Sequence, residues 1–187
     1  MTLPKYAVFF LLLVVGLQSQ ALVTEVGLAY GYQKKTFNAT NNYQTDSKSA
    51  SLSFYLFEKF ALEFSYTNSF YESQESDLNS TRTVQQSSQI IDSSLVYMMM
   101  DKKSVLQPYI KGGVAQIKKS QTVKYLNASA IEIPESTGWA PSYGGGLKIM
   151  LSERFSVKFA YEVWQTPLSD GTNSDDNSFK AGLSWYL

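Results

Sequence analysis

The side chains that could do chemistry in this sequence are carboxylates, ammonium groups and hydroxyls, because the 187 residues include no cysteine and no histidine. Thiol catalysis, disulfides, thiolate or imidazole metal sites and imidazole-based triads are therefore excluded. Serine and aspartate alone lack a base of suitable pKa, so we expect no enzyme activity. We also expect no metal and no other cofactor, with a weak cation site in the acidic stretch 169–178 as the alternative to a plain turn-rich loop. The chemistry that these side chains can still do is ion pairing and hydrogen bonding.

The charged residues recur at alternate positions of segments that are otherwise aliphatic and aromatic. From Phe155 onward, for example, every second residue is Phe, Val or Tyr, and the residues between them include Lys158 and Glu162. Successive side chains of a strand point to opposite faces, so such a segment has one apolar and one polar face. Along the chain the polar face carries these charges: Glu25, Glu63, Asp92, Lys111, Lys148, Lys158, Glu162 and Lys180.

This alternation predicts eight strands, each about as long as the 9 to 11 residues of a tilted membrane strand. Short turns at 58–59, 101–104 and 152–154 alternate with long polar connections, which we interpret as loops at 34–48, 72–89, 118–138 and 166–177. Short turns on one side and long loops on the other are typical of an outer-membrane barrel, with both termini in the periplasm. The predicted strands are 24–33, 49–57, 60–71, 90–99, 106–117, 139–151, a segment from Phe155, and 179–187.

Alternation alone does not tell which face is outside, because soluble and membrane barrels share the same period. Four carboxylates and four ammonium groups do not fit an apolar core, and a soluble barrel would have to expose its aromatic face instead. A lipid-facing aromatic band around a polar lumen avoids both problems. We therefore predict an all-β fold, an eight-stranded antiparallel up-and-down transmembrane β-barrel, with a soluble barrel or sandwich as the alternative.

The first residues have the pattern of an export signal. Lys5 precedes an apolar run over residues 6–17, and the small residues Ser19 and Ala21 fit a signal peptidase site. We predict a cleavable signal peptide at 1–21 and one barrel domain at 22–187, with an uncleaved anchor helix as the alternative. The 16 cationic and 16 acidic residues balance, so no basic field indicates a nucleic-acid partner.

The final segment, "KAGLSWYL", resembles the C-terminal signal that the barrel-assembly machinery recognises in bacterial outer-membrane proteins. Its matching residues are Lys180, Gly182, Trp185 and Leu187, of which Leu187 departs from the usual Phe. With "PYIKGGVA" and "YGGGLKIMLSERFSVKFAYE", the chain from residue 22 resembles the small barrels of the OmpA transmembrane domain, OmpX and OmpW type. This resemblance implies a monomer in the outer-membrane lipid of a Gram-negative bacterium; it leaves the subfamily open.

An eight-stranded barrel is narrow enough for its own side chains to fill it. We therefore expect a lumen plugged by an ion network, with Glu162 and Lys180 as one pair and Glu63 near Lys111, Lys148 or Lys158. The expected function is that of a structural or surface-interaction protein whose surface ligand is unknown. The barrel enzymes that this chain could resemble, such as lipid A deacylases and omptin proteases, use a histidine that it lacks.

The alternative function is passive transport of small, possibly hydrophobic molecules, as the resemblance to OmpW-type barrels implies. In the connection at 118–138, apolar side chains could line the mouth of such a path: Val123, Tyr125, Leu126, Ile131 and Ile133. The simpler interpretation of this stretch, which we favour, is an outward extension of two strands.

Overall fold

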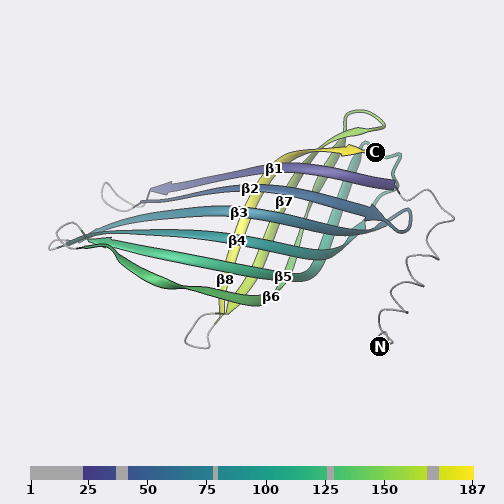
Figure 1. Ribbon diagram of the computed structural model, residues 1–187. Coiled ribbons are helices and arrows are strands. Elements are labelled where there is room, and N and C mark those ends of the chain that lie inside the picture. Colours follow the sequence, from purple (N-terminus) through teal and green to yellow (C-terminus); the bar gives the residue numbers. More distant parts are fainter. Residues whose placement is uncertain (1–22, 37–41, 78–79, 126–128, 168–172) are drawn as a thin grey trace, which may run out of the picture.

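Eight antiparallel strands form one closed sheet (Figure 1). The computed structural model describes residues 23–36, 42–77, 80–125, 129–167 and 173–187. The predicted all-β barrel is confirmed, whereas the predicted signal peptide at 1–21 lies outside the described residues. The strands are β1 (Val23–Thr36), β2 (Asn42–Tyr55), β3 (Phe60–Asp77), β4 (Ser80–Met98), β5 (Leu106–Tyr125), β6 (Ile131–Met150), β7 (Phe155–Pro167) and β8 (Asn173–Tyr186).

The strands continue well beyond the predicted membrane segments, and the prediction of four long loops is wrong. Tyr43 pairs with Ser73 and Glu72 with Gln85, inside stretches that the sequence had indicated as loops. Outside the lipid both faces of a strand meet water, so Ser, Thr, Asn and Gln replace the apolar residues while the backbone ladder persists. The favoured outward extension of β5 and β6 is confirmed, with a register shift between Lys119 and Gln121.

The β7–β8 hairpin is paired with its neighbours over a shorter stretch than the other strands. Its ladder to β1 runs from Glu25↔Tyr186 to Tyr30↔Ala181, and its ladder to β6 ends at Ser142↔Trp164. In Figure 1, β1 to β6 extend together to one end, while β7 and β8 run at a steep angle to them. Beyond these ladders, side chains connect the outward half of the hairpin to the rest of the barrel. Asp176 pairs with Lys119 of β5, and the Ser178 hydroxyl lies 3.1 Å from that of Ser47 on β2.

The outer face carries exposed aromatic and aliphatic residues, such as Phe64, Trp139 and Tyr161. The inner face is more mixed than the alternation indicated, because it also carries two buried apolar clusters. The cluster nearer the short turns is Tyr55, Ala61, Val96, Met98, Tyr109 and Ala160. The cluster nearer the outward end is Ile90, Ala115, Ile117, Ala140 and Trp164.

A charge network in the barrel lumen

Lys111 on β5 lies at the centre of the charged residues in the lumen. Its Nζ is 3.1 Å from Oε1 of Glu63 on β3 and 3.7 Å from Oδ2 of Asp92 on β4, and it also contacts Oε1 of Glu162 on β7. One ammonium group thus joins carboxylates from three other strands. All four side chains are at least nine-tenths buried, so these contacts are screened little by bulk water.

Two further lysines complete this network. Lys158 Nζ donates to Oε2 of Glu63 at 2.6 Å. Lys180 Nζ donates to Oε2 of Glu162 at 2.6 Å and to Oγ1 of Thr67 at 2.9 Å. Three carboxylates and three ammonium groups therefore balance in one cluster, which we call the lumen network: Glu63, Asp92, Lys111, Lys158, Glu162 and Lys180.

The other two residues of the predicted set, Glu25 and Lys148, form a separate pair nearer the short turns. Lys148 Nζ is 2.5 Å from Oε2 of Glu25 and donates to the Tyr186 hydroxyl at 2.6 Å. The Tyr55 hydroxyl donates to the same carboxylate oxygen at 2.6 Å. Of the three candidates for Glu63, the structure therefore places Lys111 and Lys158 beside it and Lys148 elsewhere.

Neutral side chains provide the remaining hydrogen bonds of these carboxylates. Ser94 donates to Asp92 at 2.6 Å, Ser142 donates to the other oxygen of Asp92, and Ser53 donates to Glu63 at 3.2 Å. Among the described residues, no buried side-chain nitrogen or oxygen lacks a hydrogen-bond partner. Burial of charge is tolerable under this condition, because each ion keeps partners in place of water.

The alternation places Tyr109 and Trp164 on the polar face, but it does not predict their contacts with the charges. Lys158 Nζ lies 4.9 Å from the ring centroid of Tyr109, and Lys180 Nζ lies 5.1 Å from that of Trp164. A cation within about 6 Å of an aromatic ring is attracted to its face. The sequence signal for these aromatic residues is their position in the alternation. Tyr55 lies on the same face as Ser53, and Trp164 lies on the same face as Glu162.

Gly144 makes the contact between Lys111 and Glu162 possible. In register, Lys111 of β5 pairs with Gly144 of β6, which pairs with Glu162 of β7. The missing side chain leaves space for the two charged groups to meet across β6. A Cβ at this position would lie 2.5 Å from the Tyr161 carbonyl oxygen and 3.4 Å from Glu162 Cγ.

We expect Gly144→Val to lower the free energy of unfolding by about 1 to 3 kcal/mol, the usual cost of overpacking. The measurement is urea-induced unfolding of the refolded protein in detergent micelles. Gly112→Val is the matched control on β5, because a Cβ there meets only the Ser142 carbonyl oxygen, at 4.0 Å. Equal losses in both variants would contradict the close-approach explanation.

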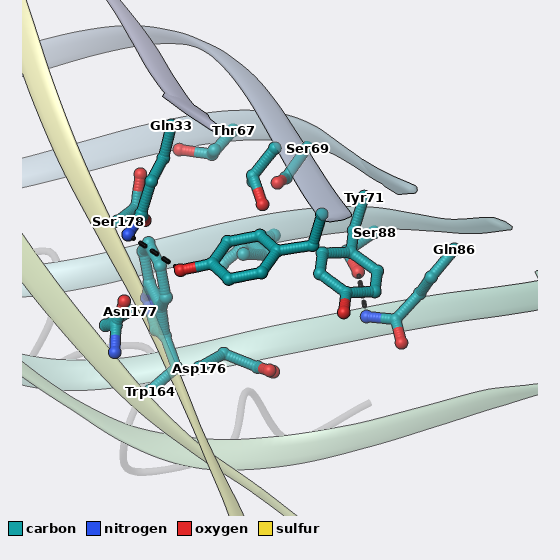
Figure 2. Close-up of a pocket in the computed structure, with 13 residues that line it drawn as sticks. Gln33, Thr67, Ser69, Tyr71, Gln86, Ser88, Trp164, Asp176, Asn177 and Ser178 are labelled. Atoms are coloured by element: carbon teal, nitrogen blue, oxygen red, sulfur yellow. Dashed lines mark hydrogen bonds between the residues drawn. The ribbon is translucent and has the colours of Figure 1, made fainter. Parts of the chain in front are cut away.

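A cavity of about 230 Å³, which we call the vestibule, lies on the outward side of the lumen network (Figure 2). Three of its residues are aromatic, namely Tyr43, Tyr71 and Trp164, and most of the others carry amides or hydroxyls. Thr67 and Ser178 connect it to the network, because Thr67 accepts a hydrogen bond from Lys180 and Ser178 is two residues from that lysine. The lining residues are Gln33, Tyr43, Thr45, Thr67, Ser69, Tyr71, Gln86, Ser88, Ile90, Trp164, Asp176, Asn177 and Ser178.

The residues of the C-terminal motif lie at the β1–β8 seam. Lys180 points into the lumen network and Trp185 is exposed on the outer face. A Cβ on Gly182 would meet the backbone of Leu28 and Ala29 on β1. The Leu187 amide donates to the Thr24 carbonyl oxygen at 2.8 Å, and this bond joins the residue after β8 to the first strand, β1.

A family profile described as "Outer membrane protein beta-barrel domain" matches residues 7–186, nearly the whole chain. The chain belongs to this family. Its members and their structural neighbours are non-enzymatic outer-membrane proteins, so the chain is a bacterial outer-membrane protein in contact with membrane lipid. No curated protein matches it.

Solved structures of small outer-membrane barrels share the fold of this chain at low sequence identity. The N-terminal β-barrel domain of Pseudomonas aeruginosa OprF is 17% identical (88% of this chain, 97% of that chain, TM-score 0.56). Neisserial surface protein A is 13% identical (89% and 97%, TM-score 0.55). Ail, the attachment invasion locus protein of Yersinia pestis, solved with the heparin analogue sucrose octasulfate, is 12% identical (90% and 100%, TM-score 0.59).

Two other features are absent from the part of the chain that the structure describes. No helix there is long and apolar enough to cross a membrane. No three side chains of the metal-ligating types gather there in a way that could hold an ion.

Proposed function

We propose that this protein is a monomeric outer-membrane barrel whose lumen is closed by the lumen network, and that it acts as a structural or surface-interaction protein. The observation that carries the proposal is the position of Lys111, whose ammonium group bridges carboxylates of β3, β4 and β7. A permeating ion would have to separate these buried pairs, and removing one partner from such a pair costs several kcal/mol. The proposal includes no catalytic residue and no cofactor.

The outward strand extensions support a role at the cell surface. β5 and β6 each have 20 residues, about twice the length that a tilted strand needs to cross a bilayer. From Ile131 to Thr137 every side chain of β6 is exposed. Two of the structural neighbours are named as a surface protein and an attachment invasion protein, which agrees with this role.

For biogenesis, we propose one signal at each end of the chain. Residues 1–21 would be removed as a signal peptide, and residues 22–187 would fold with the barrel-assembly machinery. Lys180, Gly182, Trp185 and Leu187 would serve as the assembly signal. The first three lie on β8, the strand that closes the barrel, and Leu187 follows directly after it, which supports this proposal. The family match begins at residue 7, within the proposed signal peptide, so the cleavage position rests on Ser19 and Ala21.

Passive transport is the second candidate, and the cavities of the lumen favour it. Beyond the vestibule, a further space of about 30 Å³ borders Glu63, Lys158, Glu162 and Lys180. This is about the volume of one water molecule, so the space beside the lumen network is much smaller than the vestibule. For the proposed apolar mouth, Tyr125, Ile131 and Ile133 are exposed on the β5 and β6 extensions, and Leu126 lies outside the described residues.

Single-channel conductance of the refolded protein in a planar bilayer tests the closed lumen. We expect no steady openings from protein whose folding is verified by its heat-dependent mobility on a gel. The reason is that, in a lumen closed by this network, an ion would have to break contacts of Lys111 to pass. Reproducible openings of the unmodified protein would instead place transport first.

A further inference from the structure

We propose that the vestibule binds a neutral saccharide, one ring of which enters it from the outside. This inference rests on the proposed function, because a closed lumen network is what makes the vestibule end in a floor. Three properties of its walls carry the inference: aromatic rings, uncharged hydrogen-bonding groups, and the neutralisation of each nearby charge.

The aromatic residues line the cavity from three strands. The rings of Tyr43 on β2 and Tyr71 on β3 lie 6.0 Å apart at an angle of 33°, and Trp164 on β7 contributes a third ring. Figure 2 shows Tyr71 and Trp164 on opposite sides of the space. Large amphipathic rings pack on the C–H faces of a ligand while their polar ends stay hydrogen-bonded, and this combination suits a sugar ring.

Most of the other lining residues of the vestibule carry amides or hydroxyls. Gln33 Nε2 donates to the Tyr43 hydroxyl at 3.0 Å, and Gln86 Nε2 donates to Ser88 Oγ at 3.3 Å. Each primary amide has two N–H donors and one acceptor oxygen, so it retains donor and acceptor capacity beyond this single bond. A saccharide hydroxyl both donates and accepts, which matches such a mixed lining better than a ligand that only donates or only accepts.

Electrostatics argue for a neutral ligand. Among the lining residues that the structure describes, Asp176 alone has a charged side chain, and Lys119 of β5 pairs with its carboxylate. Below the cavity, Lys180 is paired with Glu162. Neither an excess cation to hold a sulfate or phosphate nor an excess anion to hold an amine is present among the described lining residues.

The size of the vestibule fits one sugar ring. A volume of about 230 Å³ corresponds to roughly seven or eight water molecules at about 30 Å³ each. One pyranose ring with its hydroxyl groups displaces about this many. The second ring of a disaccharide would then lie toward the outward ends of β2 and β3, where the strands are rich in Ser, Thr and Gln.

Tryptophan fluorescence tests the inference with two ligands, neutral sucrose and its charged derivative sucrose octasulfate. The chain has three tryptophans, and Trp139 and Trp185 are exposed on the outer face, so W139F with W185F leaves Trp164 as the reporter. We expect sucrose to change its emission saturably, with half-saturation in the millimolar range, and sucrose octasulfate to have no such effect. The detergent must carry no sugar headgroup, because an alkyl glycoside would compete.

Tyr71→Ala should weaken sucrose binding at least tenfold, because it removes one wall of the cavity. Tyr66→Ala is the control on the same strand, since its side chain is on the outer face, and it should leave binding unchanged. If neither sucrose nor other neutral sugars change the emission of unmodified protein, or if only the octasulfate does, the inference is wrong. This outcome is measured on protein with Tyr71 in place, so it tests the inference even where Tyr71→Ala fails to fold.

A liposome-swelling assay with sucrose separates this inference from the proposed function. No swelling together with saturable fluorescence supports both. No swelling and no fluorescence change overturns the saccharide site and leaves the closed lumen standing. Swelling shows that sucrose passes the lumen network, which overturns the closed lumen and the floored vestibule together.

Discussion

Glu63→Gln is expected to lower the free energy of unfolding by about 3 to 5 kcal/mol. Glu63 is 2% exposed and accepts hydrogen bonds from both Lys111 and Lys158, at 3.1 and 2.6 Å. The amide keeps the shape of the side chain and removes its charge, so the buried ammonium group of Lys111 and the partly buried one of Lys158 lose a shared counterion. Removing one partner of a buried ion pair destabilises by this amount because the other charge stays buried. Urea-induced unfolding in micelles measures the loss.

Glu135→Gln is the matched control for this prediction. Glu135 pairs with Lys118 at 2.9 Å, but about half of each side chain is exposed, and such pairs contribute about 0 to 1 kcal/mol. A double-mutant cycle of Glu63→Gln with Lys158→Gln should recover part of the loss, because the second change removes an uncompensated cation. Equal losses at Glu63 and Glu135, or no coupling in the cycle, would show that the lumen network does not hold the barrel together.

Alternation together with the charges on the polar face is sufficient for the fold, because one lipid face and one charged face demand a closed antiparallel sheet of this kind. It also carries the pairing of neighbouring strands. Glu162 and Lys180 share the inner face of β7 and β8, and their positions in the hairpin, with Glu162 opposite Ser178, bring them within one diagonal step. Such a pair follows from parity and turn position alone.

Contacts across the lumen do not follow from the sequence in the same way. Lys111 meets Glu63 from β3, two strands away, and Glu162 from β7 on its other side. These meetings depend on the barrel radius, on strand stagger and on the empty position at Gly144, none of which a strand pattern specifies. The outward ends of the strands were missed for a different reason: once both faces are polar, periodicity in hydrophobicity disappears although the hydrogen-bonded ladder continues.

Substitutions in the lumen network are expected to open the barrel with opposite ion selectivity. The network has three carboxylates and three ammonium groups, so it is neutral as a whole. Lys111→Gln removes one positive charge and leaves an excess carboxylate, whereas Glu162→Gln leaves an excess ammonium group. Even at the dielectric constant of water, a unit charge at about 4 Å interacts by about 1 kcal/mol, roughly a fivefold effect on the relative passage of cations and anions.

Lys111→Gln should therefore conduct with a cation preference of about fivefold or more, and Glu162→Gln with an anion preference of similar size. Reversal potentials in a potassium chloride gradient across a planar bilayer measure both. Lys118→Gln makes the same charge change as Lys111→Gln on an exposed side chain of the same strand, so it should stay silent. The sign is the decisive part, because loosening of the barrel by any damaging substitution would give openings whose selectivity is the same in both variants. Opposite signs can arise only if the permeating ions pass the lumen network itself, and that would locate the barrier of the closed lumen at Lys111 and its three carboxylates.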